Sequence, residues 1–354
     1  MVRTPLLIET HPSKRNKLLA TESCDGEGGC SGRTADLSGN LPDQVADHIL
    51  SFLAITDLAR FVCVSKRCRK LYLSTPKLVS DEFSEANASE CNQRLKLLSY
   101  LDRLISHRGD NRIECFRFRW YKHNADNGDE TPCSCVHENF RMLTWIQNAV
   151  RCNVEKLDLD MTLYDYEEEL FPSCIFLCRS WRSLVVNMNC TIVKTPRRNF
   201  SSNLKYLELG YVRVGDEDFF KWVSCSCKCI EEFNISGTET ITIESSSLKK
   251  LHLSNYRNEI CHINISGEKL EDLTIAWVFD SPNENSLSIC APNLRDLKWV
   301  GNLMNRLKLG KLERLFAAGV LLQPEVDDSD NAFEVLCSLC RAKCLVLKYH
   351  NLLA

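Results

Sequence analysis

Nine segments of the chain repeat one arrangement of apolar residues. An apolar residue is followed three positions later by a second, and two positions after that by a third. The last two apolar residues of each segment alternate with other residues, which is the period of a short β-strand with one buried face. The segments are Ile113-Phe116-Phe118, Val154-Leu157-Leu159, Trp181-Leu184-Val186, Leu204-Leu207-Leu209, Ile230-Phe233-Ile235, Leu248-Leu251-Leu253, Leu270-Leu273-Ile275, Leu294-Leu297-Trp299 and a shortened Leu312-Leu315.

The spacing of these segments predicts a repeat protein. Their central residues run from Leu157 to Leu315 with a mean spacing of about 23 residues, inside the roughly 20–29 residues of leucine-rich repeats. One repeat cannot cover its own apolar face, so the repeats must stack into a solenoid. A single segment could equally be an ordinary buried strand or helical turn, but nine segments in phase favour the solenoid. The first step, from Phe116 to Leu157, is longer because of an insertion near residues 123–135.

The stretches between the segments predict a mixed outer face. FRMLTWIQNAVRC (140–152) and DEDFFKWVS (216–224) have apolar residues at helical spacing, whereas SGTETITIESSS (236–247) is strand-like. A further helix is predicted at 91–108, where Leu95, Leu98, Leu101 and Ile105 share a face.

Residues 41–76, LPDQVADHILSFLAITDLARFVCVSKRCRKLYLSTP, predict three short helices ahead of the repeats. Pro42 and Asp43 suit the start of the first helix, Thr56 can cap the second, and Pro76 ends the third. Fewer than 40 residues bury too little surface for a self-contained core. Something else must therefore cover part of an apolar set, which consists of Pro42, Val45, Ile49, Leu50, Leu58 and Val64.

The elements together predict an α/β chain, with a small three-helix unit followed by a leucine-rich-repeat horseshoe. The predicted parts are a disordered tail at 1–40, the helical unit at 41–80, a linker helix within 81–112, the repeats at 113–320, and a C-terminal helix and strand at 321–354. Two coverings of the apolar set remain open: the repeat body or the helix at 91–108 within the same chain, or another polypeptide.

Composition excludes several classes of protein. The net charge of -3 shows no excess of basic residues for a nucleic acid, and no apolar run reaches the 18 or more residues of a membrane span. The first residues do not form a secretory signal, so we expect a cytoplasmic or nuclear protein whose 20 cysteines are reduced thiols. Two cysteine clusters, CSCVH (133–137) and CSCKC (225–229), lack the paired CxxC spacing of zinc sites.

The sequence has no recognised catalytic motif. It contains no G-x-S-x-G, H-E-x-x-H, G-x-x-x-x-G-K-[ST] or G-x-G-x-x-G pattern, and none of its eight histidines is singled out as a partner for a cysteine nucleophile. We therefore expect a non-enzymatic binding protein without a cofactor or a metal.

The segment LPDQVADHILSFL…DLARFVCVSKRCRKLY closely resembles the F-box. With the repeats behind it, including WIQNAVRCNVEKLDLD and SSLKKLHLS, the chain resembles a plant F-box/leucine-rich-repeat protein over nearly its whole length after residue 40. This resemblance implies a subunit of an SCF-type (cullin–RING) E3 ubiquitin ligase, in which the F-box binds a Skp-type adaptor and through it a cullin. The repeats would then hold a target protein for ubiquitination and degradation.

The resemblance also assigns residues to adaptor binding. They are Leu41, Pro42, Val45, Ile49, Leu50, Leu58 and Val64, with Lys66 and Arg67 as polar contacts. Many F-boxes carry Trp where this chain has Cys68, and the smaller side chain would leave less anchoring surface. Relatives often continue into a further C-terminal domain, and 321–354 would hold at most the beginning of one.

Target binding is expected on the concave face of the solenoid, at residues between and after the apolar positions. The main candidates are Arg117, Arg119, Asp158, Glu208, His252 and Lys298, and the same face is expected to carry Asp160, Asn234, Ser236, Ser254, Asn264, Thr274 and Val300. No cluster of Lys and Arg converges there as an inositol phosphate would require. A repeat scaffold acting outside a ubiquitin ligase is the alternative function.

Overall fold

The computed structural model describes residues 41–83, 91–121, 138–162, 169–196, 203–236, 240–255, 262–277, 285–302, 304–322 and 329–349. The chain separates into two units, residues 1–41 and 42–354, and every helix and strand described here lies in the second unit. The tail predicted at 1–40 lies outside the described residues.

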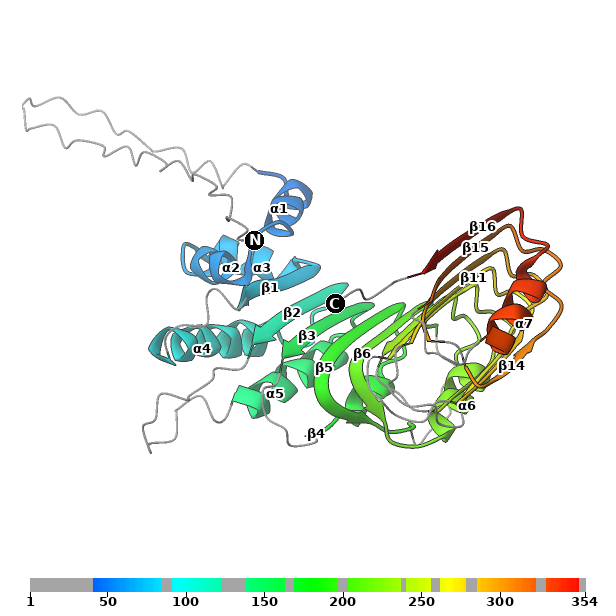
Figure 1. Cartoon of the computed structure of the whole chain (residues 1–354). Coiled ribbons are helices and arrows are strands. Elements are labelled where there is room, and N and C mark those ends of the chain that lie inside the picture. Colours follow the sequence, from blue (N-terminus) through cyan, green and yellow to red (C-terminus); the bar gives the residue numbers. More distant parts are fainter. Residues whose placement is uncertain are drawn as a thin grey trace, which may run out of the picture. The chain divides into compact units, whose positions relative to one another are not determined.

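Three helices open the second unit, as the sequence predicted (Figure 1). They are α1 (Asp43–Leu50), α2 (Ile55–Val62) and α3 (Lys66–Ser74). Asp43 lies in the first turn of α1, where a negative charge is favourable to the helix dipole. Ser65 caps α3 by accepting a hydrogen bond from the backbone N–H of Cys68 at 3.0 Å. The cap expected from Thr56 was wrong, because α2 begins at Ile55 with Ala54 in the cap position.

The helix predicted at 91–108 is present as α4 (Cys91–Arg108) and packs against α2. Tyr72 of α3 donates a hydrogen bond from its hydroxyl to the carbonyl of Leu104 at 2.9 Å. The buried guanidinium of Arg108 donates to the carbonyl oxygens of Tyr72 and Thr75, which lie at the end of α3. These bonds join α3 of the three-helix unit to α4.

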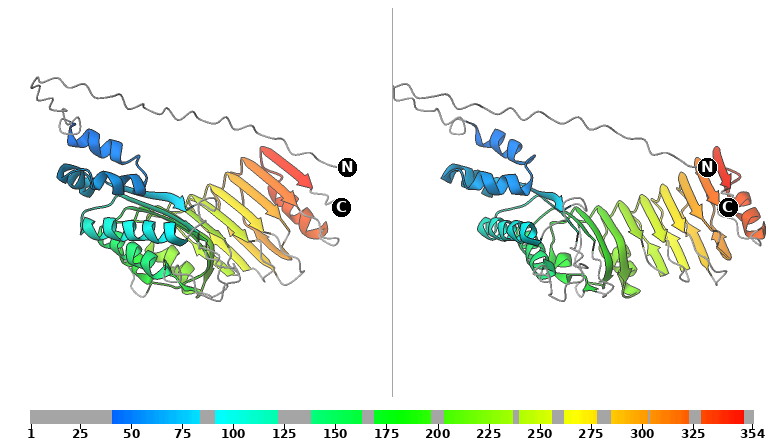
Figure 2. Two further views of the ribbon diagram at one scale, coloured as in Figure 1. Left: turned by 90° about the vertical axis from the view of Figure 1, so that its left-hand side faces the viewer. Right: turned by 60° about the vertical axis from the view of Figure 1, so that its left-hand side comes forward.

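A parallel sheet forms the body of the protein, with its strands following one another in chain order (Figures 1 and 2). Its strands are β1 (Lys77–Phe83), β2 (Cys115–Tyr121), β3 (Lys156–Thr162), β5 (Ser183–Val193), β6 (Tyr206–Val214), β7 (Glu232–Ser236), β9 (Lys250–Asn255), β11 (Asp272–Trp277), β13 (Asp296–Gly301), β15 (Ala317–Leu322) and β16 (Cys344–Tyr349). The short strand β4 (Glu169–Leu170) pairs with β5 off this path. The main sheet confirms the predicted leucine-rich-repeat solenoid.

The opposite side of the solenoid is mixed, as predicted. Helices cover its first half: α5 (Glu138–Arg151), the 3₁₀-helix η3 (Ser173–Leu177) and α6 (Asp218–Ser226). A second parallel sheet then replaces them, formed by β8 (Thr240–Glu244), β10 (His262–Ser266), β12 (Ser286–Cys290) and β14 (Arg306–Leu309). Helix α7 (Ser329–Leu339) packs beside β14.

The core lies between the main sheet and this outer layer. The same inward position of each strand is aligned across the sheet by the strand register, in a row formed by Leu78, Phe116, Leu157, Leu184, Leu207, Phe233, Leu251, Leu273, Leu297, Ala318 and Leu345. All of them except the last, which lies on the edge strand β16, are buried. Stacked apolar rows of this kind hold a solenoid together.

A buried ion pair joins α4 to α5 beneath the first strands. Arg94 donates to both carboxylate oxygens of Glu138, at 3.0 and 2.7 Å, and the indole of Trp120 donates to the same carboxylate at 2.8 Å. Both charged side chains are at most 3% exposed, and a buried charge of this kind is tolerated because it is paired and hydrogen-bonded.

The structure corrects the repeat pattern at both ends. The sheet contains β1 and β16, for which no segment was predicted, and β15 continues the pattern through Leu315, Ala318 and Val320 instead of the predicted Leu312 and Leu315. Leu312 is buried but precedes the strand by five positions. The predicted linker region therefore contains α4 beside a sheet that already begins at Lys77. The predicted C-terminal helix and strand are present, and β16 pairs with β15 as part of the main sheet.

Gly301 should be intolerant of any side chain. Its φ is +117°, and a Cβ built on it would lie 1.6 Å from the carbonyl oxygen of Trp277 on the neighbouring strand. We expect Gly301→Ala to lower the free energy of unfolding by about 2 kcal/mol or more, because backbone strain and a direct clash add together. Chemical denaturation followed by circular dichroism measures this loss.

Gly319 on β15 provides the matched control. A Cβ added there meets no atom within 4 Å, and its φ is not positive. Gly319→Ala should therefore be neutral or slightly stabilising. Equal stability losses for the two variants would contradict this account of Gly301.

Candidate functional site

The three N-terminal helices expose an apolar surface, which we call the helical patch. It consists of Val45, Ile49, Phe52 and Val64, whose exposed fractions are 45%, 48%, 74% and 74%. A group of large exposed apolar side chains on a small unit is typical of an interaction site. The helical patch is not covered by α4 or by the repeats in the described part of the chain. For Val45, Ile49 and Val64, the structure therefore does not show the alternative in which the same chain covers the apolar set.

The residues predicted to contact an adaptor divide into two groups. Pro42, Val45, Ile49, Val64 and Lys66 are exposed, while Leu41 and Arg67 are half-buried. These residues remain available to a partner, and their role stays a prediction.

Leu50 and Leu58 belong to the interior instead, with exposed fractions of 2% and 0%. Ala46, Ile55 and Leu71 of the same helices are buried as well. Helix α2, which carries Leu58, packs against α3, α4 and β1, and α1, which carries Leu50, packs against α3. For these two residues the structure therefore shows covering within the same chain.

Cys68 also lies inside the unit, with an exposed fraction of 1%. Its thiol is 3.1 Å from the hydroxyl of Ser65 at the start of α3. Cys68 therefore contributes to packing within the helices, and the weaker adaptor anchoring expected from this small side chain stays a prediction.

The second candidate surface is the open face of the main sheet, on the side away from the helices. One outward position per strand forms a row in register, which we call the middle row: Val79, Arg117, Asp158, Val185, Glu208, Asn234, His252, Thr274, Lys298, Gly319 and Val346. Five of the six main candidates for target binding lie in it, and Arg119 lies two positions further along β2. The sequence therefore placed these side chains on one face correctly.

The middle row is too long to form one pocket. From β2 to β13 there are seven strand steps, or about 34 Å. At one end Arg117 and Asp158 form an ion pair at 2.7 Å. Asn264 was also expected on this face, but β10 belongs to the second sheet, so its side chain lies on the opposite side of the solenoid.

A polar groove of about 720 Å³ lies at the centre of the open face, over β6, β7, β9 and β11. Tyr206 donates a hydrogen bond from its hydroxyl to the carboxylate of Glu208, and the side-chain amide of Asn234 donates to that hydroxyl at 3.0 Å. Burial, followed by the hydrogen bond to Glu208, raises the pKa of Tyr206, so the phenol stays protonated as a donor. The groove can therefore offer hydrogen-bonding groups held in fixed positions.

His252 lies on the wall of this groove. Loss of surrounding water lowers its pKa, the positive charge of Lys298 lowers it further, and Glu208 opposes the shift. The neutral imidazole is the favoured form at neutral pH, so this residue contributes a hydrogen-bonding group instead of a charge.

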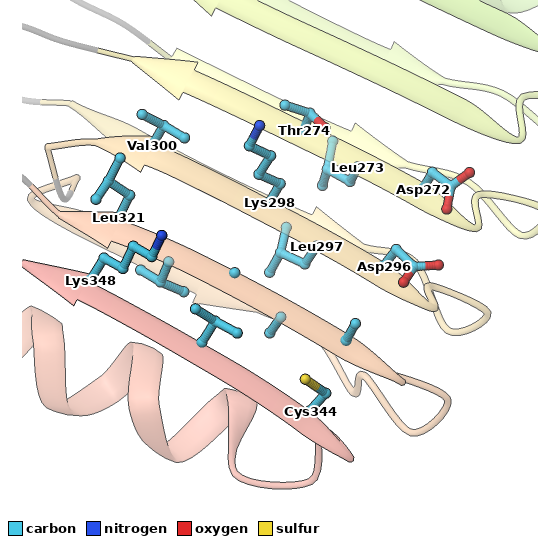
Figure 3. A pocket seen from close by; sticks show the side chains of 15 residues that line it. Asp272, Leu273, Thr274, Asp296, Leu297, Lys298, Val300, Leu321, Cys344 and Lys348 are labelled. Carbon is cyan, nitrogen blue, oxygen red and sulfur yellow. The ribbon is translucent and has the colours of Figure 1, made fainter.

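A second hollow, of about 580 Å³, lies over β13, β15 and β16 (Figure 3). Apolar and small residues dominate its surface, with Asp272 and Asp296 at one end and Lys348 at the other. Of its residues, only Thr274, Lys298 and Val300 were among the candidates. The C-terminal strand was predicted, but it was not recognised as a further repeat, although Ala342, Leu345 and Leu347 have the repeat spacing. Its outward residues were therefore not among the candidates.

Cysteine clusters do not form metal sites in the described part of the chain. There, no three His, Cys, Asp or Glu side chains come together at one point. Of the CSCKC segment, Cys227 is buried while Cys225 and Cys229 are exposed. The CSCVH segment lies outside the described residues. No described helix is both long and apolar enough to cross a membrane.

Comparison with known proteins matches both parts of the chain. The family model described as "FBD-associated F-box protein At5g56370, LRR repeats" matches residues 142–324, and the F-box domain model matches residues 39–71. Similar proteins from Arabidopsis thaliana include F-box/LRR-repeat protein At4g14103, which is 23% identical over 90% of this chain and 79% of its own length. F-box/LRR-repeat protein At4g14096 is 24% identical over 90% of this chain and 63% of its own length.

FBD-associated F-box protein At4g13985, also from Arabidopsis thaliana, is 25% identical over 76% of this chain and 52% of its own length. The chain spans about half the length of several of the curated relatives that it matches.

The electrostatic account of the groove can be checked at His252. Its pKa in the folded protein should lie below the ordinary value of 6.5, and Lys298→Ala should raise it by removing a nearby positive charge. Because folding lowers this pKa, the unfolded chain binds the proton more tightly. The contribution of His252 to stability should therefore decrease as the pH falls through the range between the two values.

A ¹H–¹³C NMR titration, with His252→Gln to assign the resonance, measures the shift. Lys308→Ala on β14, in the second sheet, serves as the control and should leave the titration unchanged. A pKa that does not respond to Lys298→Ala would contradict the assigned cause.

Proposed function

Because the chain belongs to the family of plant F-box proteins with leucine-rich repeats, we propose that it is the target-recognition subunit of an SCF-type ubiquitin ligase. Its F-box would bind a Skp-type adaptor, and through it a cullin, while the repeats hold a protein to be ubiquitinated. The observation that carries the proposal is the helical patch, a set of exposed apolar side chains on the part of the chain that matches the F-box model.

The helical patch is suited to a protein partner. F-box domains bind Skp-type adaptors in SCF complexes. Full burial of one large aliphatic side chain contributes about 1.5–3 kcal/mol, so covering Val45, Ile49 and Val64 together could sustain a stable complex. Pro42 immediately precedes α1, and Lys66, two positions after Val64, begins α3. These two exposed residues would complete the contact with apolar and polar surface.

The repeats would supply the binding site for the target. The open face of the sheet carries outward side chains over its whole length. Its central groove presents Glu208 and Asn234, and the hydroxyl of Tyr206 holds both side chains by hydrogen bonds. F-box/LRR proteins are generally non-catalytic adaptors. In this proposal the isopeptide chemistry belongs to other subunits, and the chain raises the effective concentration of the target near them.

The contact between the two parts supports this division of roles. Arg108 and Tyr72 tie the end of α3 to α4 through buried hydrogen bonds, and burial raises the pKa of Tyr72 to about 12, which keeps its hydroxyl a donor. A tight connection would hold the target in a constant direction relative to the adaptor. Cytoplasmic and nuclear localisation, and the absence of nucleic-acid and membrane partners, stay predictions.

Changing the helical patch should weaken adaptor binding without unfolding the chain. We expect Val45→Asp and Ile49→Asp each to weaken binding to a Skp-type adaptor by about tenfold or more, because each removes apolar burial and adds a charge to be desolvated. Co-purification and isothermal titration with the adaptor measure the effect.

Phe140→Asp is the matched control, since Phe140 is 73% exposed on α5, outside the F-box match. It makes the same kind of change and should leave adaptor binding intact. Leu50 is unsuitable for this test because its burial would make an Asp variant unfold. If the wild-type chain failed to co-purify with any Skp-type adaptor, the scaffold alternative would replace this proposal.

A further inference from the structure

A trough runs along β15 on the open face of the main sheet, and we call it the β15 trough. Its floor is formed by the outward positions of β15, which are Ala317, Gly319 and Leu321. The small residues create the hollow: Gly319 has no side chain, whereas its register partners are Lys298 on one side and Val346 on the other. The result is a hollow of about 580 Å³ with an apolar floor between two raised walls (Figure 3).

Opposite charges mark the two ends of the β15 trough. Asp272 and Asp296 lie side by side at the beginning of their strands, in register with Ala317. Lys348 lies in register with Leu321 at the other end, and Lys298 occupies the wall between. In the described part of the chain, no ion pair is found for either lysine or for Asp296. The ends are therefore available to charges on a partner.

The carboxylate end favours a cation. Asp272 is 3.8 Å from Lys250, yet its pKa is raised by burial and by the neighbouring Asp296. Two adjacent carboxylates, of which only Asp272 is near a lysine, would be stabilised by one more positive charge.

The spacing of these features matches an extended polypeptide. Side chains at positions i, i+2 and i+4 of a strand lie on one face, and four residues cover about 13 Å. Three features of the trough follow this spacing along β15. The carboxylate pair lies level with Ala317, the hollow lies over Gly319, and Lys348 lies level with Leu321. An extended segment with a basic, a bulky aliphatic and an acidic residue at alternate positions would place one side chain against each.

We propose that the β15 trough binds an extended segment of a partner protein with this basic-x-aliphatic-x-acidic pattern, read in either chain direction. The basic residue would pair with Asp272 and Asp296, the aliphatic side chain would fill the space over Gly319, and the acidic residue would pair with Lys348. The inference rests on the proposed function, because it names the kind of segment that the repeats hold. A small molecule fits less well, because the hollow is open along its length and encloses no ligand on all sides.

Two labelled peptides probe the β15 trough directly. One is Gly-Ser-Lys-Ser-Leu-Ser-Glu-Ser-Gly and the other has the Lys and Glu exchanged, each carrying fluorescein, with binding to the full chain followed by anisotropy. At least one should bind, and replacing its Leu by Gly should weaken binding at least fivefold. Binding of neither peptide at up to about 1 mM would overturn the proposal.

Gly319→Val is the decisive variant. A Cβ at this position meets no atom within 4 Å, so the strand can accept the side chain while the hollow fills. Peptide binding should weaken at least tenfold. Asn264→Val, at an exposed position on β10 of the second sheet, is the matched control and should change nothing. Equal affinities for wild type and Gly319→Val would overturn the proposal.

Reversing the charge at Lys348 tests the proposed ion pair with the acidic residue of the peptide. Lys348→Glu should weaken binding of the better peptide at least fivefold and improve binding of a peptide in which Glu is replaced by Lys. If Lys348→Glu has the same effect on both peptides, the assigned pairing is wrong.

Adaptor co-purification, measured on the same proteins, separates the two proposals. Gly319→Val should retain the adaptor. If the wild-type chain binds the adaptor but neither peptide, only the proposed role of the β15 trough is overturned. If it binds a peptide but no adaptor, only the proposed function is overturned.

Discussion

The in-register stacking of parallel strands is the constraint on which the rest of the structure depends. Side chains alternate between the two faces of a strand, so each repeat must contribute an apolar residue inward for every residue it presents outward. Because the register is maintained from β1 to β16 over most of each strand, the outward positions also line up, and residues more than 200 positions apart in the sequence share one row. The binding surface is thus a direct consequence of the packing that stabilises the fold.

Much of this fold could be predicted from the sequence, because the period of the apolar residues is a strong local signal. The helix at 91–108 and the mixed outer layer followed from periodicity alone. The strand β1 could not be found in the same way, because the pattern is polar at two of its three positions: Thr75, which precedes the strand, and Ser80 within it are buried polar residues on either side of Leu78. At β15 the inward residues are Ala318 and Val320, and the stronger leucine pair at 312 and 315 drew the predicted segment three positions too early.

The sites were predicted less completely, because exposure depends on tertiary packing. Apolar residues at helical spacing are alike in sequence, and only the packing of α1 against α3 separates buried Leu50 from exposed Ile49. Similarly, Asn264 lies in an apparent repeat segment, but its strand belongs to the second sheet. The β15 trough arises because Ala317 has a small side chain and Gly319 has none. A search for charged or polar candidates does not detect such positions.

The chain has two separate binding surfaces: the helical patch on its N-terminal helices, and the open face of the sheet on its repeats. Hydrogen–deuterium exchange of the full chain, with and without a Skp-type adaptor, tests this claim most directly. The account predicts that the adaptor slows exchange within residues 42–65 and leaves β6 to β16 unchanged. Slower exchange on the open face of the sheet, or no change in α1 and α2, would contradict it.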